Sequence, residues 1–107
     1  MKASAVPAIA ALAILIVSTM IALAEEEVEL IQGEFRDGRQ HLAVRNNTTS
    51  MIDAVAVNCG FFRENVLVEA TTTMIHNVLP GQMGYNYTSS DASGVTSVDC
   101  RIEEVYR

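Results

Sequence analysis

The sequence predicts an all-β protein: a small antiparallel β-sandwich of six to seven strands with one disulfide, preceded by a signal peptide. Three observations lead to this prediction. After residue 24, turn-forming residues recur at spacings of roughly 8 to 12 residues. Apolar residues alternate with small or polar ones between these turns, and no segment keeps a helical period. The chain also contains only two cysteines, Cys59 and Cys100.

The first 24 residues predict a secretory signal peptide. Lys2 supplies a positive start, an uncharged apolar stretch follows, and Ala22-Leu23-Ala24 is a small-x-small cleavage signal directly before Glu25. An uncleaved membrane anchor over residues 5–24 stays open, because about 20 apolar residues can span a bilayer. A lipoprotein needs a cysteine at the cleavage point, and none is there. Cleavage leaves residues 25–107 as one domain of a periplasmic or secreted protein.

A domain this small needs a covalent cross-link more than a large one does. In an exported protein, Cys59 and Cys100 are expected to form that disulfide. Two free buried thiols are the alternative. The chain has no Cys-x-x-Cys motif, so a structural role is favoured over a catalytic redox role.

The predicted mature chain is acidic. It carries all 13 carboxylates and only six arginines, a formal net charge of −7. Such a surface repels phosphate backbones, so nucleic acid is a poor candidate partner. Solubility explains the charge more simply than attraction to a basic partner does.

The first half of the domain reads as three strands. Residues 28–35 and 41–45 flank an Asp-Gly turn, which is typical of a tight hairpin. Asn46-Asn47-Thr48-Thr49-Ser50 is polar turn sequence. The central strand is Ile52 to Phe62, and alternate residues form its buried face: Val55, Val57, Cys59 and Phe61.

The second half reads as three further strands. A hairpin at residues 63–65 leads to a strand rich in β-branched residues over 66–75, which is long enough to bend or change partners. Leu79-Pro80-Gly81 is a turn before the strand 83–88. A loop over residues 89–94 precedes the last strand, 95–106, in which Val98, Cys100 and Ile102 share a face.

The stretch from Arg45 to Cys100 resembles the FxLYD-type domains, small immunoglobulin-like or fibronectin-like sandwiches of exported bacterial proteins. The resemblance rests on four features in order: the polar turn, the central strand ending in Phe61-Phe62, Val66-Leu67-Val68, and Leu79-Pro80-Gly81-Gln82. Arg63 and Asn65 depart from the acidic residue and the glycine of the family's hairpin. The resemblance implies an extracytoplasmic interaction domain and carries no catalytic residues.

Catalytic and metal-binding chemistry is not expected. The candidates for a hydrolase are two histidines (His41, His76), two aspartates (Asp53, Asp91) and five serines (Ser50, Ser89, Ser90, Ser93, Ser97), but no nucleophile motif surrounds any serine. The two histidines have no ligand spacing. The glutamates at positions 25, 26, 27 and 29 lack the pattern of a calcium loop. No cofactor is predicted.

Three asparagines match the N-glycosylation acceptor, which has meaning only in a eukaryotic secretory pathway: Asn46, Asn47 and Asn86. Tyr85 and Tyr87 share a face with Met83. We expect this face to pack into the core, with the hydroxyls at the rim. The alternative is an exposed aromatic strip that binds a partner or a carbohydrate, and inward-facing Asn86 and Thr88 would favour it.

The expected function is therefore non-enzymatic: an exported domain that binds an unknown protein or supports the cell envelope, with no membrane contact after cleavage. One alternative is a small secreted or periplasmic inhibitor of a hydrolase, for which residues 89–94 are the candidate loop. Another is a membrane-anchored subunit that keeps residues 5–24 as a helix.

Overall fold

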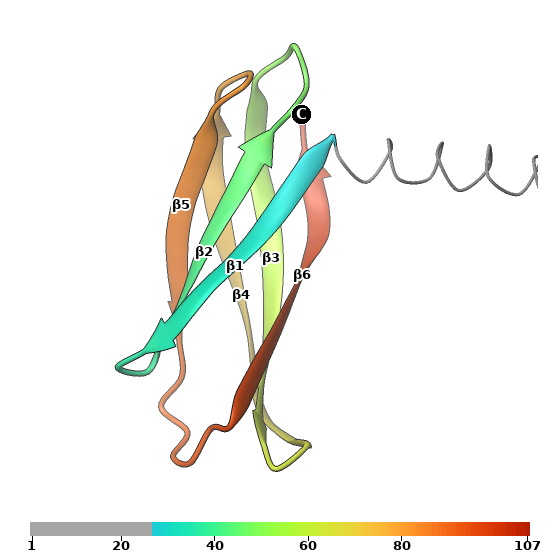
Figure 1. Cartoon of the computed structure of the whole chain (residues 1–107). Helices are drawn as coiled ribbons and strands as arrows, with labels where there is room; N and C mark the ends of the chain where they lie inside the picture. Colours follow the sequence, from blue (N-terminus) through green and yellow to red (C-terminus); the bar gives the residue numbers. More distant parts are fainter. Residues whose placement is uncertain (1–26) are drawn as a thin grey trace, which may run out of the picture.

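Two three-stranded antiparallel sheets pack face to face in the computed structural model, which describes residues 27–107 (Figure 1). The first sheet has the strand order β1-β2-β5 and the second β4-β3-β6. Both sheets are fully antiparallel. The strands are β1 (Val28–Arg36), β2 (Arg39–Asn46), β3 (Ile52–Arg63), β4 (Val66–Val78), β5 (Met83–Ser89) and β6 (Ser97–Tyr106). The predicted sandwich of six to seven strands is confirmed, with six.

Tight two-residue loops close the hairpins β1-β2 and β3-β4. Asp37 and Gly38 both have positive φ in the first, and Glu64 and Asn65 both have positive φ in the second. Two consecutive positive φ angles match the right-handed twist of the flanking strands. The sequence predicted both hairpins. Strand β4 is longer than predicted, and it stays paired with β3 along its whole length instead of changing partners.

The core lies between β3 and the first sheet. The inner face of β3 is fully buried at Val55, Val57, Cys59 and Phe61, as predicted. The first sheet covers these residues with a second buried set, which consists of Val28, Leu42 and Val44. At roughly 1.5–3 kcal/mol for each buried aliphatic or aromatic side chain, this double layer is the main stabilising feature of the fold.

The disulfide joins Cys59 to Cys100 as predicted, and it joins neighbouring strands of one sheet. The two cysteines lie directly opposite each other in the β3-β6 ladder. Cys59 is fully buried, whereas Cys100 is half-buried. A disulfide of this kind indicates an oxidising compartment outside the cytoplasm.

Buried polar groups organise the turns at one end of the sandwich. The side chain of Asn46 is fully buried, and its Nδ2 donates to the carbonyl oxygens of Ser50 and Val78. Its Oδ1 accepts from the backbone N–H and the hydroxyl of Thr48. One asparagine therefore connects the polar turn after β2 to the end of β4, as buried polar groups require.

The predicted signal peptide over residues 1–24, its cleavage signal at Ala22, Ala24 and Glu25, and the alternative anchor over 5–24 lie outside the described residues. Within residues 27–107, no helix has the length and apolarity to cross a membrane.

Candidate functional site

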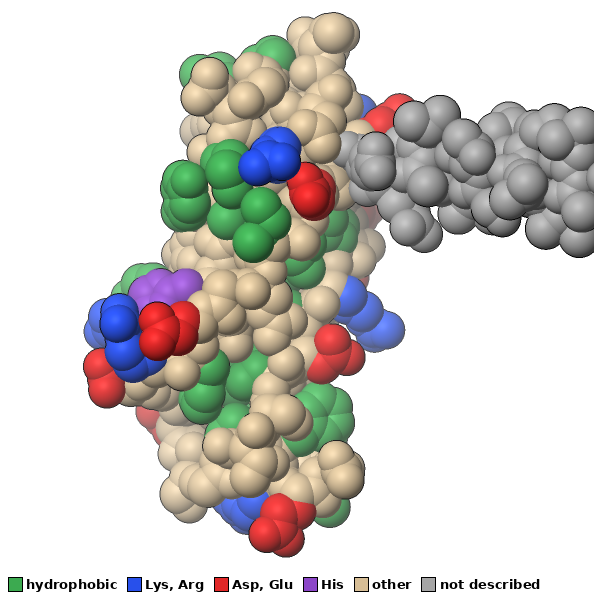
Figure 2. Space-filling view, in the orientation of Figure 1, with side chains coloured by type: hydrophobic (Ala, Val, Ile, Leu, Met, Phe, Trp, Pro, Cys, Tyr) green, Lys and Arg blue, Asp and Glu red, His purple; other side chains and the backbone are tan. Residues whose placement is uncertain are grey.

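The outer face of the β1-β2-β5 sheet is arranged in rows that run across the three strands. One row is Glu29, Arg45 and Met83, and the next is Ile31, Ala43 and Tyr85. A third row pairs His41 of β2 with Tyr87 of β5. We call the apolar and aromatic members of these rows the aromatic strip: Ile31, His41, Ala43, Met83, Tyr85 and Tyr87. In Figure 2, hydrophobic side chains gather on this face beside basic and acidic groups.

The middle of the aromatic strip is almost wholly apolar. Tyr85 is 73% exposed, which is more than any other large hydrophobic residue in residues 27–107. It borders a shallow depression of about 280 Å³ that is also lined by Ile31, Ala43 and Met83. Its hydroxyl lies 3.7 Å from the sulfur of Met83. The ring and the thioether thus form one apolar surface.

Charged groups border the aromatic strip at both ends. At one end, Arg45 donates to Glu29 at 3.2 Å and approaches the Met83 sulfur at 3.9 Å. At the other end, the guanidinium of Arg39 lies 4.7 Å from the centroid of the Tyr87 ring. Guanidinium groups are attracted to aromatic faces at such distances. These contacts fix both ends of the strip.

The structure corrects the prediction that Met83, Tyr85 and Tyr87 pack into the core. Tyr85 and Tyr87 are exposed, and the inner face of β5 consists instead of Gly84, Asn86 and Thr88. Thr88 is buried, and its hydroxyl is 2.6 Å from that of Thr71 on β4. Asn86, though partly open to solvent, turns toward β4 and donates to the carbonyl of Met74 at 2.7 Å.

The reason is the close approach of β5 to β4. A methyl group added to Gly84 would lie 2.7 Å from Cγ2 of Ile75 and 2.9 Å from Cγ2 of Val78. Only glycine or short polar side chains fit this inner face, so the large side chains point outward. Alternation along β5 predicted its two faces correctly, but hydrophobicity assigned the wrong one to the core.

The structure does not bring the candidate catalytic residues together. His41 is on β2 of the first sheet, whereas His76 is on β4 of the second and exposed. Asp53 and Asp91 are exposed. Among the five serines only Ser90 is buried, and its hydroxyl hydrogen-bonds to Glu69 and accepts from the N–H of Ala92. The hydroxyl of Ser90 is thus used within the fold.

Metal-binding residues are also dispersed in the described part of the chain. Within residues 27–107, no group of three or more His, Cys, Asp or Glu side chains is placed to hold a metal ion. Two glutamates of the N-terminal acidic run form ion pairs: Glu27 with Arg107 at 3.3 Å, and Glu29 with Arg45 at 3.2 Å. Glu25 and Glu26 lie outside the described residues.

The three glycosylation candidates differ in access. Asn46 is fully buried and hydrogen-bonded, so the folded domain cannot present it to an enzyme. Asn47 is exposed in the turn. The Nδ2 of Asn86 is engaged with Met74 and Thr73 of β4. Asn47 is the acceptor that the fold leaves most accessible of the three.

One ionisable group on β6 is perturbed. The hydroxyl of Tyr106 donates to Oε2 of Glu104 at 2.8 Å. This hydrogen bond, together with repulsion between the two negative charges, raises the pKa of Tyr106 above its ordinary value.

Comparisons of the chain with protein-family models, curated proteins and solved structures find no match.

Proposed function

We propose that this protein is a non-enzymatic interaction domain that works outside the cytoplasm, and that its aromatic strip binds another protein. The observation that carries the proposal is the exposure of Tyr85 on a hydrogen-bonded sheet beside Met83 and Ile31. Exposed tyrosine with two rotatable side-chain bonds offers a large contact area at a small entropic cost. Aromatic residues and methionine are also enriched in protein interfaces.

The chemistry of the strip favours a protein over a carbohydrate. A sugar needs hydrogen-bonding side chains around the aromatic ring, but the depression is lined by Ile31, Ala43 and Met83, with His41 as the one polar side chain besides Tyr85 itself. The charged groups at the ends, Arg39 and the Glu29–Arg45 pair, suit the polar rim of a protein interface.

Kinship with the FxLYD-type immunoglobulin-like domains is part of this proposal. The all-β two-sheet architecture, the tight β3-β4 hairpin and the turn at Leu79-Pro80-Gly81 support it. In that turn, the N–H of Gln82 donates to the carbonyl of Leu79, and the N–H of Gly81 donates to the carbonyl of Asn46. Such domains are interaction modules of exported bacterial proteins, so a periplasmic location is proposed with the family.

Site-specific photocrosslinking tests the strip directly. A photoreactive phenylalanine analogue is placed at Tyr85, and the control carries it at His76, which is exposed on β4 of the other sheet. We expect crosslinking to a discrete protein in intact cells from position 85 but not from position 76. Equal adducts from both positions, or none from position 85, would contradict the proposal. Circular dichroism of both variants checks that the fold is retained.

A second candidate is inhibition of a hydrolase by the β5-β6 loop, which spans residues 90–96. The loop is held at several points: Arg63 Nε donates to the carbonyl of Ser93 at 2.9 Å, and the N–H of Thr96 donates to the carbonyl of Phe62 at 2.8 Å. Inhibitors present rigid loops of this kind. Photocrosslinking from Asp91, which is exposed in this loop, distinguishes the two candidates.

The membrane-anchored alternative concerns residues 5–24. Fractionation of cells into membrane and soluble envelope fractions, with the mass of the mature chain, tests cleavage after Ala24.

A further inference from the structure

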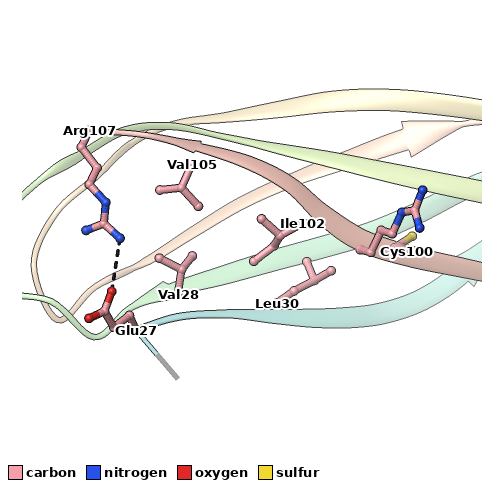
Figure 3. A pocket seen from close by; sticks show the side chains of 8 residues that line it. Glu27, Val28, Leu30, Cys100, Ile102, Val105 and Arg107 are labelled. Carbon is pink, nitrogen blue, oxygen red and sulfur yellow. Dashed lines mark hydrogen bonds and ion pairs between the residues drawn. The ribbon is translucent and has the colours of Figure 1, made fainter. Parts of the chain in front are cut away.

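The two long sides of the sandwich differ. On one side, β5 lies against β4, and the two strands are joined by a hydrogen bond between Thr88 and Thr71 and by hydrogen bonds from Asn86 to Thr73 and Met74. On the other side, β1 and β6 diverge around a groove of about 630 Å³. We call this groove the β1-β6 groove. Its apolar lining consists of Val28, Leu30, Cys100, Ile102 and Val105, and three charged residues complete the wall: Arg101 and the ion pair of Glu27 with Arg107 (Figure 3).

The groove leaves the inner face of β6 incompletely covered. The inner residues of β3 are fully buried at Val57 and Cys59, but their partners in the ladder, Ile102 and Cys100, are only half-buried. Val105 is also half-buried. Strand β6 pairs on one side. Covering its half-exposed apolar side chains with another element would bury apolar surface and so stabilise the protein.

The outer edge of β6 presents backbone groups toward the groove. The N–H of Cys100 donates to Oε1 of Gln32, and Nε2 of Gln32 donates to the carbonyl of Val98. The amide of Gln32 thus bonds this edge as the peptide group of an adjacent strand does. Because backbone groups two residues apart point the same way in an antiparallel strand, the N–H of Ile102 also points outward.

We propose that an extended segment of a partner protein adds to this edge of β6 as a fourth strand of the β4-β3-β6 sheet. The alternate side chains of the added strand contact Leu30, Ile102 and Val105, and its backbone bonds the outward groups of β6. Strand addition of this kind derives affinity from the backbone and specificity from alternate side chains.

The outer face of β6 defines the charges of the added strand. Three charged residues follow one another along this outer face, and each is exposed to solvent: Asp99, Arg101 and Glu104. Within residues 27–107, no carboxylate lies within ion-pair distance of Arg101. The complementary strand carries a carboxylate opposite Arg101, flanked by basic side chains that meet Asp99 and Glu104.

A lipid and a second copy of the chain fit the groove less well. An acyl chain would remove water from the outward N–H and carbonyl groups of β6 without replacing their hydrogen bonds. A second β6 aligned with Cys100 opposite Ile102 would place Arg101 against Arg101. The ladder with β3 also shifts register next to Glu103, and such a bulge on an edge strand opposes self-pairing.

Hydrogen exchange with designed peptides tests the proposal on the oxidised full chain. The probe is a seven-residue peptide in which valine alternates with lysine, aspartate and lysine. The control peptide has the opposite charge at each of these three positions. We expect the amide of Ile102 to exchange fast in the free protein and slowly with the probe peptide. The amide of Arg101, which faces β3, should be slow in both states.

Two matched variants sharpen the test. Arg101→Glu should weaken binding of the probe peptide by roughly three- to fivefold, the scale of a cross-strand charge pair, and improve binding of the control peptide. Arg36→Glu, at the far end of β1 in the other sheet, should leave both affinities unchanged. A probe peptide that is N-methylated on its bonding edge should not bind.

Several outcomes overturn the proposal. The Ile102 amide could be protected in the free protein at low concentration, or the N-methylated peptide could bind as well as the probe. Protection of Ile102 that rises with protein concentration alone would assign the edge to a second copy. A third outcome is that octanoate binds in the groove and leaves the Ile102 amide unprotected, while the probe peptide does not bind. That outcome would assign the groove to a small apolar ligand. The aromatic strip lies on the other sheet, so its failure and this one are separable.

Discussion

Removing the disulfide should destabilise this domain more than any single surface change. The perturbation is the double substitution Cys59→Ala with Cys100→Ala. In the structure, the disulfide holds β6 to β3, and among residues 27–107 β3 is the only strand that pairs with β6. Alanine is preferable to serine at position 59 because the site is fully buried, and a hydroxyl without a partner there would add a separate cost.

The expected magnitude follows from the loop that the disulfide closes. The cysteines are 41 residues apart in sequence, and closing a loop of that length in the unfolded chain is worth about 4 kcal/mol in the chain-entropy model. A domain of this length has a total unfolding free energy of about 4 to 12 kcal/mol. Loss of the disulfide should therefore remove a third or more of the stability.

Urea denaturation followed by circular dichroism measures the loss. The wild-type protein is compared in oxidised form, in reduced form and as the double alanine variant, with intact mass recording the thiol state. The reduced wild type keeps every core atom, so its difference from the double variant isolates the packing of the two sulfurs. Hydrogen exchange should show the amides of β6 opening before those of β2.

The reasoning is refuted if the reduced protein and the double variant both unfold within 1 kcal/mol of the oxidised protein. That result would mean that the β3-β6 ladder and the core hold β6 without the cross-link. A second refutation is a wild-type mass that shows two free thiols after purification under oxidising conditions.

Three further perturbations have specific expected outcomes. Gly84→Ala should lower the unfolding free energy by about 1–3 kcal/mol in urea titrations, because the added methyl group overlaps Ile75. Glu64→Asn should raise it by a few tenths to about 1 kcal/mol, since Glu64 has a φ of 49° and asparagine tolerates that region better; an unchanged midpoint would contradict this. In ultraviolet titration of tyrosinate, Glu104→Gln should lower the pKa of Tyr106, because the substitution removes both the carboxylate acceptor and its negative charge. If the titration curve is the same in both proteins, the hydrogen bond is not formed in solution.

Much of the fold could be predicted because local rules govern it. Asp37-Gly38 predicts a two-residue hairpin loop since both positions need positive φ. The alternation of Val55, Val57, Cys59 and Phe61 predicts one buried face, and burial of that face is complete. The pairing of Cys59 with Cys100 followed from having two cysteines in an exported chain, and the ladder places them opposite each other.

The candidate site could not be predicted in the same way. The periodicity of Met83, Tyr85 and Tyr87 identifies a shared face, but not which side of the sheet that face lies on. The side depends on how closely β5 approaches β4. These two strands belong to different sheets, so the packing of the sheets determines the distance between them. Gly84 between two large residues was the available signal, because a glycine inside a strand often marks a close backbone approach.

By itself, the sequence determined the class of the fold, the order and approximate bounds of its strands, the core face of β3 and the identity of the disulfide. These features depend on residue spacing and on backbone preferences over a few residues. The tertiary structure alone decided that the tyrosines of β5 face solvent, that β4 and β5 close one side of the sandwich, and that β1 and β6 leave the other side open. Those outcomes depend on the distances between strands of different sheets, which packing determines and local sequence does not.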